Sequence, residues 1–171
     1  MWGHGYLLDT NIVAYWFDER RSEHQLVLQH IQELPDVTPL MISAITLGEI
    51  EYGLQVARIG ALEQEAFRAF ISTNLPMVLD ITKATRIYYG LLRASIFEKY
   101  APNPRRRRGL RPEQLIDPVT SRELGIQEND LWIAAQALEY NLVLVTNDKM
   151  ERIRDVCEDF QVENWTANAS D

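Results

Sequence analysis

The sequence predicts an α/β fold built on a parallel β-sheet with helices on both faces. Short apolar runs alternate along the chain with longer segments in which apolar residues recur at helical spacing. The clearest run, Leu142-Val143-Leu144-Val145, is unbroken, as is typical of a strand buried in a parallel sheet. Strands that alternate with helices indicate βαβ units, which place parallel strands side by side.

Five short apolar runs are predicted to be strands. The first run stops at Asp9-Thr10-Asn11 and the fourth at Thr146-Asn147-Asp148, and both clusters contain turn-forming and helix-capping residues. The predicted strands are residues 6–8, 39–43, 75–81, 142–145 and 160–162.

The segments between these strands are predicted to be helices. Pro35 ends the second helical pattern, and Asn141 is a suitable C-terminal stop for an alanine-rich helix. The predicted helices are one that starts at residues 9–11, residues 22–34, one whose apolar face contains Leu47, Ile50 and Leu54, and residues 61–70, 82–97 and 130–140.

Composition indicates a cytoplasmic protein. A length of 171 residues fits a single domain, residues 1–171. The single cysteine, Cys157, excludes an intramolecular disulfide framework and a cysteine-based zinc site. The N-terminus lacks the pattern of a signal peptide, and no apolar run is long enough to span a membrane.

One segment, at about residues 100–128, departs from the alternating pattern. It is rich in proline and arginine, shows little apolar periodicity, and reads as a long loop inserted into the domain. The net charge of −8 argues against a general nucleic-acid coat, because phosphate binding favours a basic surface. The loop could be a solvated, charged segment, a clamp for a phosphate backbone, or the source of an arginine that reaches an acidic pocket of the same chain and dampens its activity. Its candidate phosphate-binding residues, which would bind RNA if RNA is the ligand, are Arg105, Arg106, Arg107 and Arg108.

Four acidic residues are candidate catalytic and metal-binding groups: Asp9, Glu49, Asp130 and Asp148. Taken singly, each could cap a helix or interact with its dipole; Glu49, for example, follows Thr46 at capping-box spacing. Three of them lie just beyond a predicted strand or at a helix start that faces the same edge of the sheet, and Glu49 lies about one turn into the helix after the second strand. The carboxyl ends of the strands in an open parallel sheet gather along that edge. Four carboxylates gathered there would repel one another without a counter-charge, so the pattern predicts a site for Mg²⁺ or Mn²⁺.

The segments around these acids resemble the motifs of PIN-domain ribonucleases. Leu7-Leu8-Asp9-Thr10-Asn11 is similar to the first motif, and the segment from Ser43 to Ile50 is similar to the second. Residues 129–137 resemble the third motif and residues 144–148 the fourth, in family order over nearly the whole chain. The resemblance is strongest to VapC-type toxins of type II toxin–antitoxin systems.

This resemblance implies a three-layer α/β/α fold with a central parallel sheet and a Mg²⁺- or Mn²⁺-dependent endoribonuclease. It implies that the four acids hold the metal, that Asn11 and Thr146 support them by hydrogen bonding, and that metal-activated water cleaves RNA. The implied partners are an RNA substrate, an antitoxin protein and a second copy of the chain, with no membrane. The segment at about 100–128 is longer than the usual family connection.

The alternative is a catalytically silent PIN-like module that only binds protein or RNA. All four acids are present, which favours the enzyme. Calorimetric titration with Mg²⁺ or Mn²⁺ separates the two, because a silent module should show no specific metal site.

Overall fold

The computed structural model describes residues 5–103 and 109–167, which form two compact units. Unit 1 comprises Met1–Asp80, Asn141–Lys149 and Val162–Asp171, and unit 2 comprises Ile81–Tyr140 and Met150–Gln161. The chain therefore passes from unit 1 to unit 2 twice, and each time it returns to add a strand to the sheet of unit 1.

Unit 1 contains a five-stranded parallel sheet with the order β3-β2-β1-β4-β5. The α/β class and the central parallel sheet are thereby confirmed. The strands are β1 (Tyr6–Leu8), β2 (Leu40–Ser43), β3 (Met77–Leu79), β4 (Val143–Val145) and β5 (Val162–Glu163).

The third strand is shorter than the sequence predicts. The expected strand over residues 75–81 has only its centre, Met77–Leu79, in the sheet. Leu75 instead caps the preceding helix through a hydrogen bond from its N–H to the carbonyl of Ile71 (2.8 Å). The apolar run at Leu75 thus serves the end of a helix, and apolar character alone does not distinguish the two roles.

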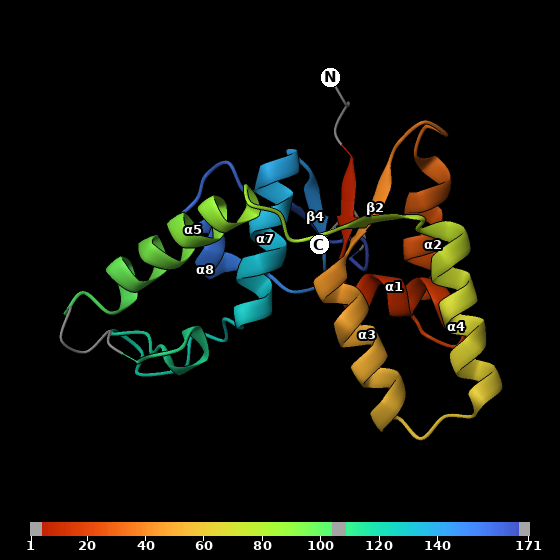
Figure 1. Cartoon of the computed structure of the whole chain (residues 1–171), viewed down its shortest axis with the longest axis horizontal. Coiled ribbons are helices and arrows are strands. Elements are labelled where there is room, and N and C mark those ends of the chain that lie inside the picture. Colours follow the sequence, from red (N-terminus) through yellow and green to blue (C-terminus); the bar gives the residue numbers. More distant parts are fainter. Residues whose placement is uncertain (1–4, 104–108, 168–171) are drawn as a thin grey trace. The chain divides into compact units, whose positions relative to one another are not determined.

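Four helices of unit 1 pack with the sheet around a shared core. Figure 1 shows α1 between α3 and α4, and contacts join α1 to both. Leu8, Ile42 and Val145 are neighbours in register on adjacent strands, are fully buried, and belong to this core. The helices are α1 (Thr10–Phe17), α2 (His24–Glu33), α3 (Ala44–Val56) and α4 (Ala61–Asn74).

Unit 2 is built on two long helices that lie side by side, α5 (Thr85–Tyr100) and α7 (Glu128–Tyr140) (Figure 1). It also contains the short helix α8 (Glu151–Arg154). Among the described residues between α5 and α7, the regular structure comprises the 3₁₀ helix η1 (Pro112–Gln114) and one isolated bridge, Ile116 to Glu123. Leu115 and Ile126 in this segment are buried, so the described part of the insertion packs onto unit 2.

None of the helices in the described part of the chain combines the length and the apolar composition that a membrane crossing requires.

Candidate active site

Asp9 and Thr146 follow two neighbouring strands at the point where the strand order of the sheet reverses. β1 pairs with β2 on one side and with β4 on the other, so the chain connections diverge between β1 and β4. The backbone N–H of Asp9 donates to the carbonyl oxygen of Val145 (3.0 Å), which continues the ladder to the ends of both strands. In open parallel sheets this switch point is where ligand sites form.

Both carboxylate oxygens of Asp9 are held by hydrogen-bond donors. Oδ1 accepts from the backbone N–H of Thr10 (2.8 Å), which makes Asp9 the N-cap of α1. Oδ2 accepts from the Thr146 hydroxyl (2.7 Å) and from Nδ2 of Asn11 (3.2 Å). Asp9 is only 7% exposed, and these bonds hold its carboxylate in one orientation.

Glu49 and Asp148 are connected to Asp9 through the two residues that follow it. The Thr10 hydroxyl donates to Oε2 of Glu49 (2.5 Å), which links the first turn of α1 to α3. Nδ2 of Asn11 also lies 3.1 Å from the Thr146 hydroxyl and 3.5 Å from Oδ2 of Asp148. Three of the four predicted acids therefore share one polar network in unit 1.

The pKa of Asp9 is raised in this environment. Burial is the largest cause, and the charges of Glu49 and Asp148 raise it further. The hydrogen bonds from Thr146 and Thr10 act in the opposite direction but do not cancel the increase. The ionised form of Asp9 is therefore held in place by donors while neighbouring negative charge disfavours it.

This donor set suits a hard divalent cation. Carboxylate oxygens are the ligands that Mg²⁺ and Mn²⁺ take in proteins, and a cation would relieve the repulsion that raises the pKa of Asp9. In residues 5–103 and 109–167, no three His, Cys, Asp or Glu side chains are grouped closely enough to enclose a metal ion. The unit 1 acids are instead joined through Thr10, Asn11 and Thr146.

Asp130, the fourth predicted acid, lies in unit 2 in the first turn of α7. Its Oδ2 accepts a hydrogen bond from the backbone N–H of Gln127 (2.9 Å), just before the helix begins. A carboxylate in this position also interacts favourably with the helix dipole. The predicted role of Asp130 at the start of this helix is confirmed in that respect.

The helix-cap explanations of the other acids hold for one residue and fail for two. Asp9 is an N-cap, as expected. Glu49 is not part of a capping box, because Ser43 caps α3 by accepting from the Ile45 N–H (2.9 Å). Asp148 does not cap α8, whose N-cap is Met150. Glu49 and Asp148 thus do not have the helix-capping role that each residue, considered singly, could have had.

Thr10 has a role that the sequence did not assign. It stands between two residues of the first motif, but the motif alone gives no reason to pair its hydroxyl with Glu49, 39 positions away. Asn11 and Thr146, by contrast, are hydrogen-bonded to Asp9 as predicted.

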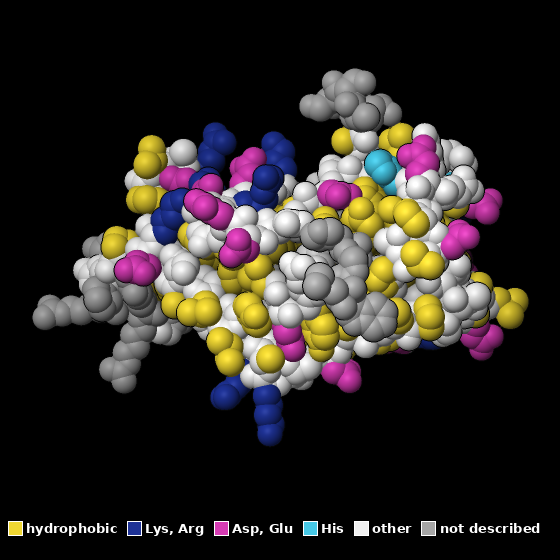
Figure 2. Space-filling model, turned by 90° about the horizontal axis from the view of Figure 1, so that it is seen from above, with side chains coloured by type: hydrophobic (Ala, Val, Ile, Leu, Met, Phe, Trp, Pro, Cys, Tyr) yellow, Lys and Arg dark blue, Asp and Glu magenta, His cyan; other side chains and the backbone are white. Residues whose placement is uncertain are grey.

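The predicted RNA-binding residues, Arg105, Arg106, Arg107 and Arg108, lie outside the described residues. On the face that Figure 2 shows, the coloured Lys and Arg side chains stand in separate places among Asp and Glu side chains. The residues coloured on that face form no continuous basic surface, in keeping with the net charge of −8.

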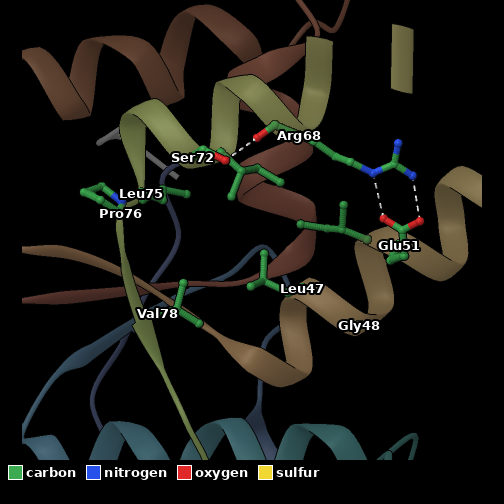
Figure 3. A pocket seen from close by; sticks show the side chains of 10 residues that line it. Leu47, Gly48, Glu51, Arg68, Ser72, Leu75, Pro76 and Val78 are labelled. Carbon is green, nitrogen blue, oxygen red and sulfur yellow. Dashed lines mark hydrogen bonds and ion pairs between the residues drawn. The ribbon is translucent and has the colours of Figure 1, made fainter. Parts of the chain in front are cut away.

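A separate pocket of about 610 Å³ lies in unit 1 between α3 and α4, and none of the four acids lines it (Figure 3). Its walls are largely apolar, with Leu47, Leu75 and Val78 among them. At its edge Glu51 forms a two-point ion pair with Arg68 (2.6 and 3.0 Å). Glu51 is therefore on the same helix as Glu49 but in a different environment, which makes it a suitable control.

The PIN domain profile matches residues 6–158, which include residues of both units and all four acids. The chain belongs to the PIN domain family. The match covers most of the chain, and Asp9, Glu49, Asp130 and Asp148 lie within it.

Two proteins of similar sequence are named ribonucleases. One is Ribonuclease VapC2 of Rickettsia felis, which is 27% identical over 160 residues, covering 94% of this chain and 97% of the relative. Another is Ribonuclease VapC1 of Haemophilus influenzae, which is 29% identical over 161 residues, covering 94% of this chain and 98% of the relative.

Several solved structures have a similar fold. VapBC2 from Rickettsia felis, bound to a DNA fragment from its promoter, has a chain with a TM-score of 0.64 and 24% identity, covering 94% of this chain and 98% of that chain. VapBC-1 from nontypeable Haemophilus influenzae has the same TM-score and identity, with coverages of 95% and 98%. FitAcB from Neisseria gonorrhoeae reaches 0.64 at 18% identity, with coverages of 94% and 97%.

Proposed function

We propose that this PIN domain protein is a metal-dependent endoribonuclease and the toxin of a toxin–antitoxin pair. The observation that supports this most directly is the network at the ends of β1 and β4, where Asp9 is buried, oriented by three donors and close to two further acids. Relatives that align with nearly the whole chain are named ribonucleases. We also propose that residues 1–171 form a single PIN domain with an insertion at about 100–128.

The proposed metal ligands are Asp9, Glu49, Asp130 and Asp148, with Mg²⁺ or Mn²⁺ as the cofactor. PIN ribonucleases generally use a divalent metal. Such an ion, when bound, lowers the pKa of water and stabilises charge on a phosphodiester in an in-line displacement. Asn11 and Thr146 orient the Asp9 carboxylate, and Thr10 orients that of Glu49.

The proposed partners are an RNA substrate, an antitoxin and a second copy of this chain, all in the cytoplasm. Similar structures are VapBC and FitAB-type complexes, and one is described as bound to promoter DNA. A small neighbouring gene for a DNA-binding antitoxin would distinguish a toxin from a housekeeping nuclease. Co-purification of its product with this chain would confirm the pair.

Cleavage of a defined RNA pool by the purified chain tests the enzymatic proposal. We expect cleavage with Mg²⁺ or Mn²⁺ and none with EDTA. Asp9→Asn and Asp130→Asn should abolish cleavage, since each removes one of the charged ligands that hold the metal. Circular dichroism verifies that both variants are folded.

The matched control is Glu51→Gln, on the same helix as Glu49 but paired with Arg68 at the edge of the pocket. It should cleave RNA at the wild-type rate. Full cleavage by either aspartate variant would overturn the assignment of the site. A wild-type chain that binds no Mn²⁺ in calorimetry and leaves RNA intact would favour the catalytically silent module.

A further inference from the structure

The start of α7, which carries Asp130, is held by side chains from two other segments of unit 2. The first N–H groups of a helix have no partner within the helix, so they need acceptors from elsewhere. The Gln127 N–H uses the carboxylate of Asp130 itself (2.9 Å). The next N–H, that of Glu128, donates to Oε1 of Glu113 (2.8 Å).

Glu113 belongs to the insertion, in the 3₁₀ helix η1, 15 positions before its hydrogen-bond partner. Burial would raise the pKa of Glu113, but the hydrogen bond from the Glu128 N–H and the charges of Arg111 and Arg93 lower it. Glu113 therefore presents an ionised carboxylate to the positive end of α7, where charge-assisted bonds are strongest.

The insertion around Glu113 is held in place by contacts within unit 2. Leu115, two residues later, is only 2% exposed. Asp117 accepts hydrogen bonds from the N–H groups of Val119 (2.8 Å) and Thr120 (3.0 Å) and forms an ion pair with Arg152 (2.9 Å). Glu113 thus projects from an anchored segment, which gives it a defined position relative to α7.

The side chain of Glu128 is held from α5. Nη1 of Arg93 lies 2.5 Å from both of its carboxylate oxygens, and the Tyr89 hydroxyl also donates to it. The Tyr89 ring stacks on Trp132 of α7, with centroids 3.8 Å apart and planes 7° apart. The backbone of Glu128 is therefore hydrogen-bonded to the insertion, and its side chain is bound by residues of α5.

These contacts bear on Asp130 because its carboxylate is tied to the turn that they hold. Asp130 Oδ2 is bonded to the Gln127 N–H, and Gln127 is covalently joined to Glu128. A shift of the Glu128 backbone would move Gln127 and so change the orientation of the Asp130 carboxylate. Metal-ligating carboxylates depend on such supporting bonds for their geometry.

We propose that Glu113 of the insertion is a positioning residue for Asp130, which it orients through the Glu128 N–H. Arg93 and Tyr89 complete the support from α5. The insertion thereby has a function in the chemistry of the site that does not depend on the run from Arg105 to Arg108. This inference rests on the proposed function, because it concerns a metal ligand of the nuclease.

Glu113→Ala and Glu113→Gln, tested in the full chain, distinguish positioning from general structural support. Glu113 is exposed, so neither substitution creates a cavity in the core. Alanine removes the acceptor for the Glu128 N–H, whereas glutamine keeps an oxygen that can accept. The matched control is Glu123→Ala, an exposed glutamate of the same insertion.

We expect Glu113→Ala to exchange its amide hydrogens at residues 127–130 faster than wild type, with an unchanged Tm. Supporting residues of metal sites typically contribute 10–100-fold, so we expect about 10-fold weaker Mn²⁺ binding and about 10-fold lower kcat. KM for RNA should stay constant. In Glu113→Gln the amide exchange rate, the Mn²⁺ affinity and kcat should lie closer to the wild-type values. In Glu123→Ala these three quantities should be unchanged.

Unchanged amide exchange and unchanged Mn²⁺ affinity in Glu113→Ala would overturn the inference. An equal defect in Glu113→Gln would overturn it as well. A fall in Tm with no change in kcat would also overturn it, because it would show a structural role alone. Failure of the proposed function looks different, since the wild-type chain itself would then neither bind Mn²⁺ nor cleave RNA. The exchange measurement requires no activity and still decides whether Glu113 holds α7.

Discussion

The hydroxyl of Thr146 is the buried donor on which the ionised form of Asp9 depends most. Thr146 is fully buried and donates to Oδ2 of Asp9 over 2.7 Å. Its oxygen also accepts from the Asp148 N–H and lies 3.1 Å from Nδ2 of Asn11. Thr146→Val preserves the shape of the side chain but removes this hydroxyl, so the substitution isolates the hydrogen bonds.

The expected loss follows from the charge on Asp9. A hydrogen bond to an ionised group contributes about 1.5–3 kcal/mol when it is buried, so Thr146→Val should lower the free energy of unfolding by about 2 kcal/mol at neutral pH. In a domain of this size that lowers Tm by about 4–8 °C. Burial and the charges of Glu49 and Asp148 already raise the pKa of Asp9, and losing the Thr146 bond raises it further.

The sign of the pH dependence follows from this pKa. The bond from Thr146 favours the ionised carboxylate, so its contribution is fully present above the pKa of Asp9 in the folded variant. It is lost as the pH falls from that pKa through the lower pKa of Asp9 in the wild type, below which Asp9 is protonated in both proteins. The difference in stability between wild type and Thr146→Val should therefore shrink in acid.

Urea unfolding followed by circular dichroism, with EDTA present and at several pH values, measures this difference. Thr146→Ser is the control, because it keeps the hydroxyl and loses one buried methyl group. That loss costs about 1 kcal/mol and should be the same at every pH. A Thr146→Val protein as stable as wild type at neutral pH, or one whose deficit is independent of pH, would refute the reasoning.

Three further predictions concern other parts of the chain. Hydrogen bonds from Arg68 and Gln55 lower the pKa of Glu51 to about 2, so Arg68→Met should return it toward its usual value in an NMR titration; an unshifted value would contradict the ion pair. Hydrogen bonds from the Thr120 and Val119 N–H groups lower the pKa of Asp117, so its stabilising contribution is present above the ordinary aspartate pKa and is lost as the pH falls through the lowered one. Asp117→Ala should abolish that dependence and speed limited proteolysis of the insertion, and equal digestion rates would count against it. Replacing Arg105 to Arg108 with serine should weaken RNA binding and flatten its salt dependence by about 0.7 for each lost phosphate contact, whereas an unchanged slope would favour a solvated loop.

The sequence alone determined the order of strands and helices and the identity of the family. Parallel strands buried in a sheet need unbroken apolar runs, and helices need apolar residues at a fixed period, so both leave a local signal. The signal was imprecise at two strands: Leu75 belongs to the end of a helix and only Met77–Leu79 of residues 75–81 pair in the sheet. The strand predicted at residues 160–162 lies instead at Val162–Glu163. Asn11 and Thr146, which the motif resemblance predicts to support the acids, are hydrogen-bonded to Asp9.

Tertiary structure decided several pairings of polar groups that no motif indicated. Thr10 with Glu49, and Glu113 with the Glu128 N–H, are pairs whose members come from different elements. Nothing in the local sequence of either partner encodes such a pairing, because a hydrogen bond between elements depends on how they pack. For the same reason Glu49 and Asp148 could be interpreted as helix caps until the structure placed Ser43 and Met150 in those positions. Local patterns thus fixed the scaffold, while packing fixed the environment of its acids.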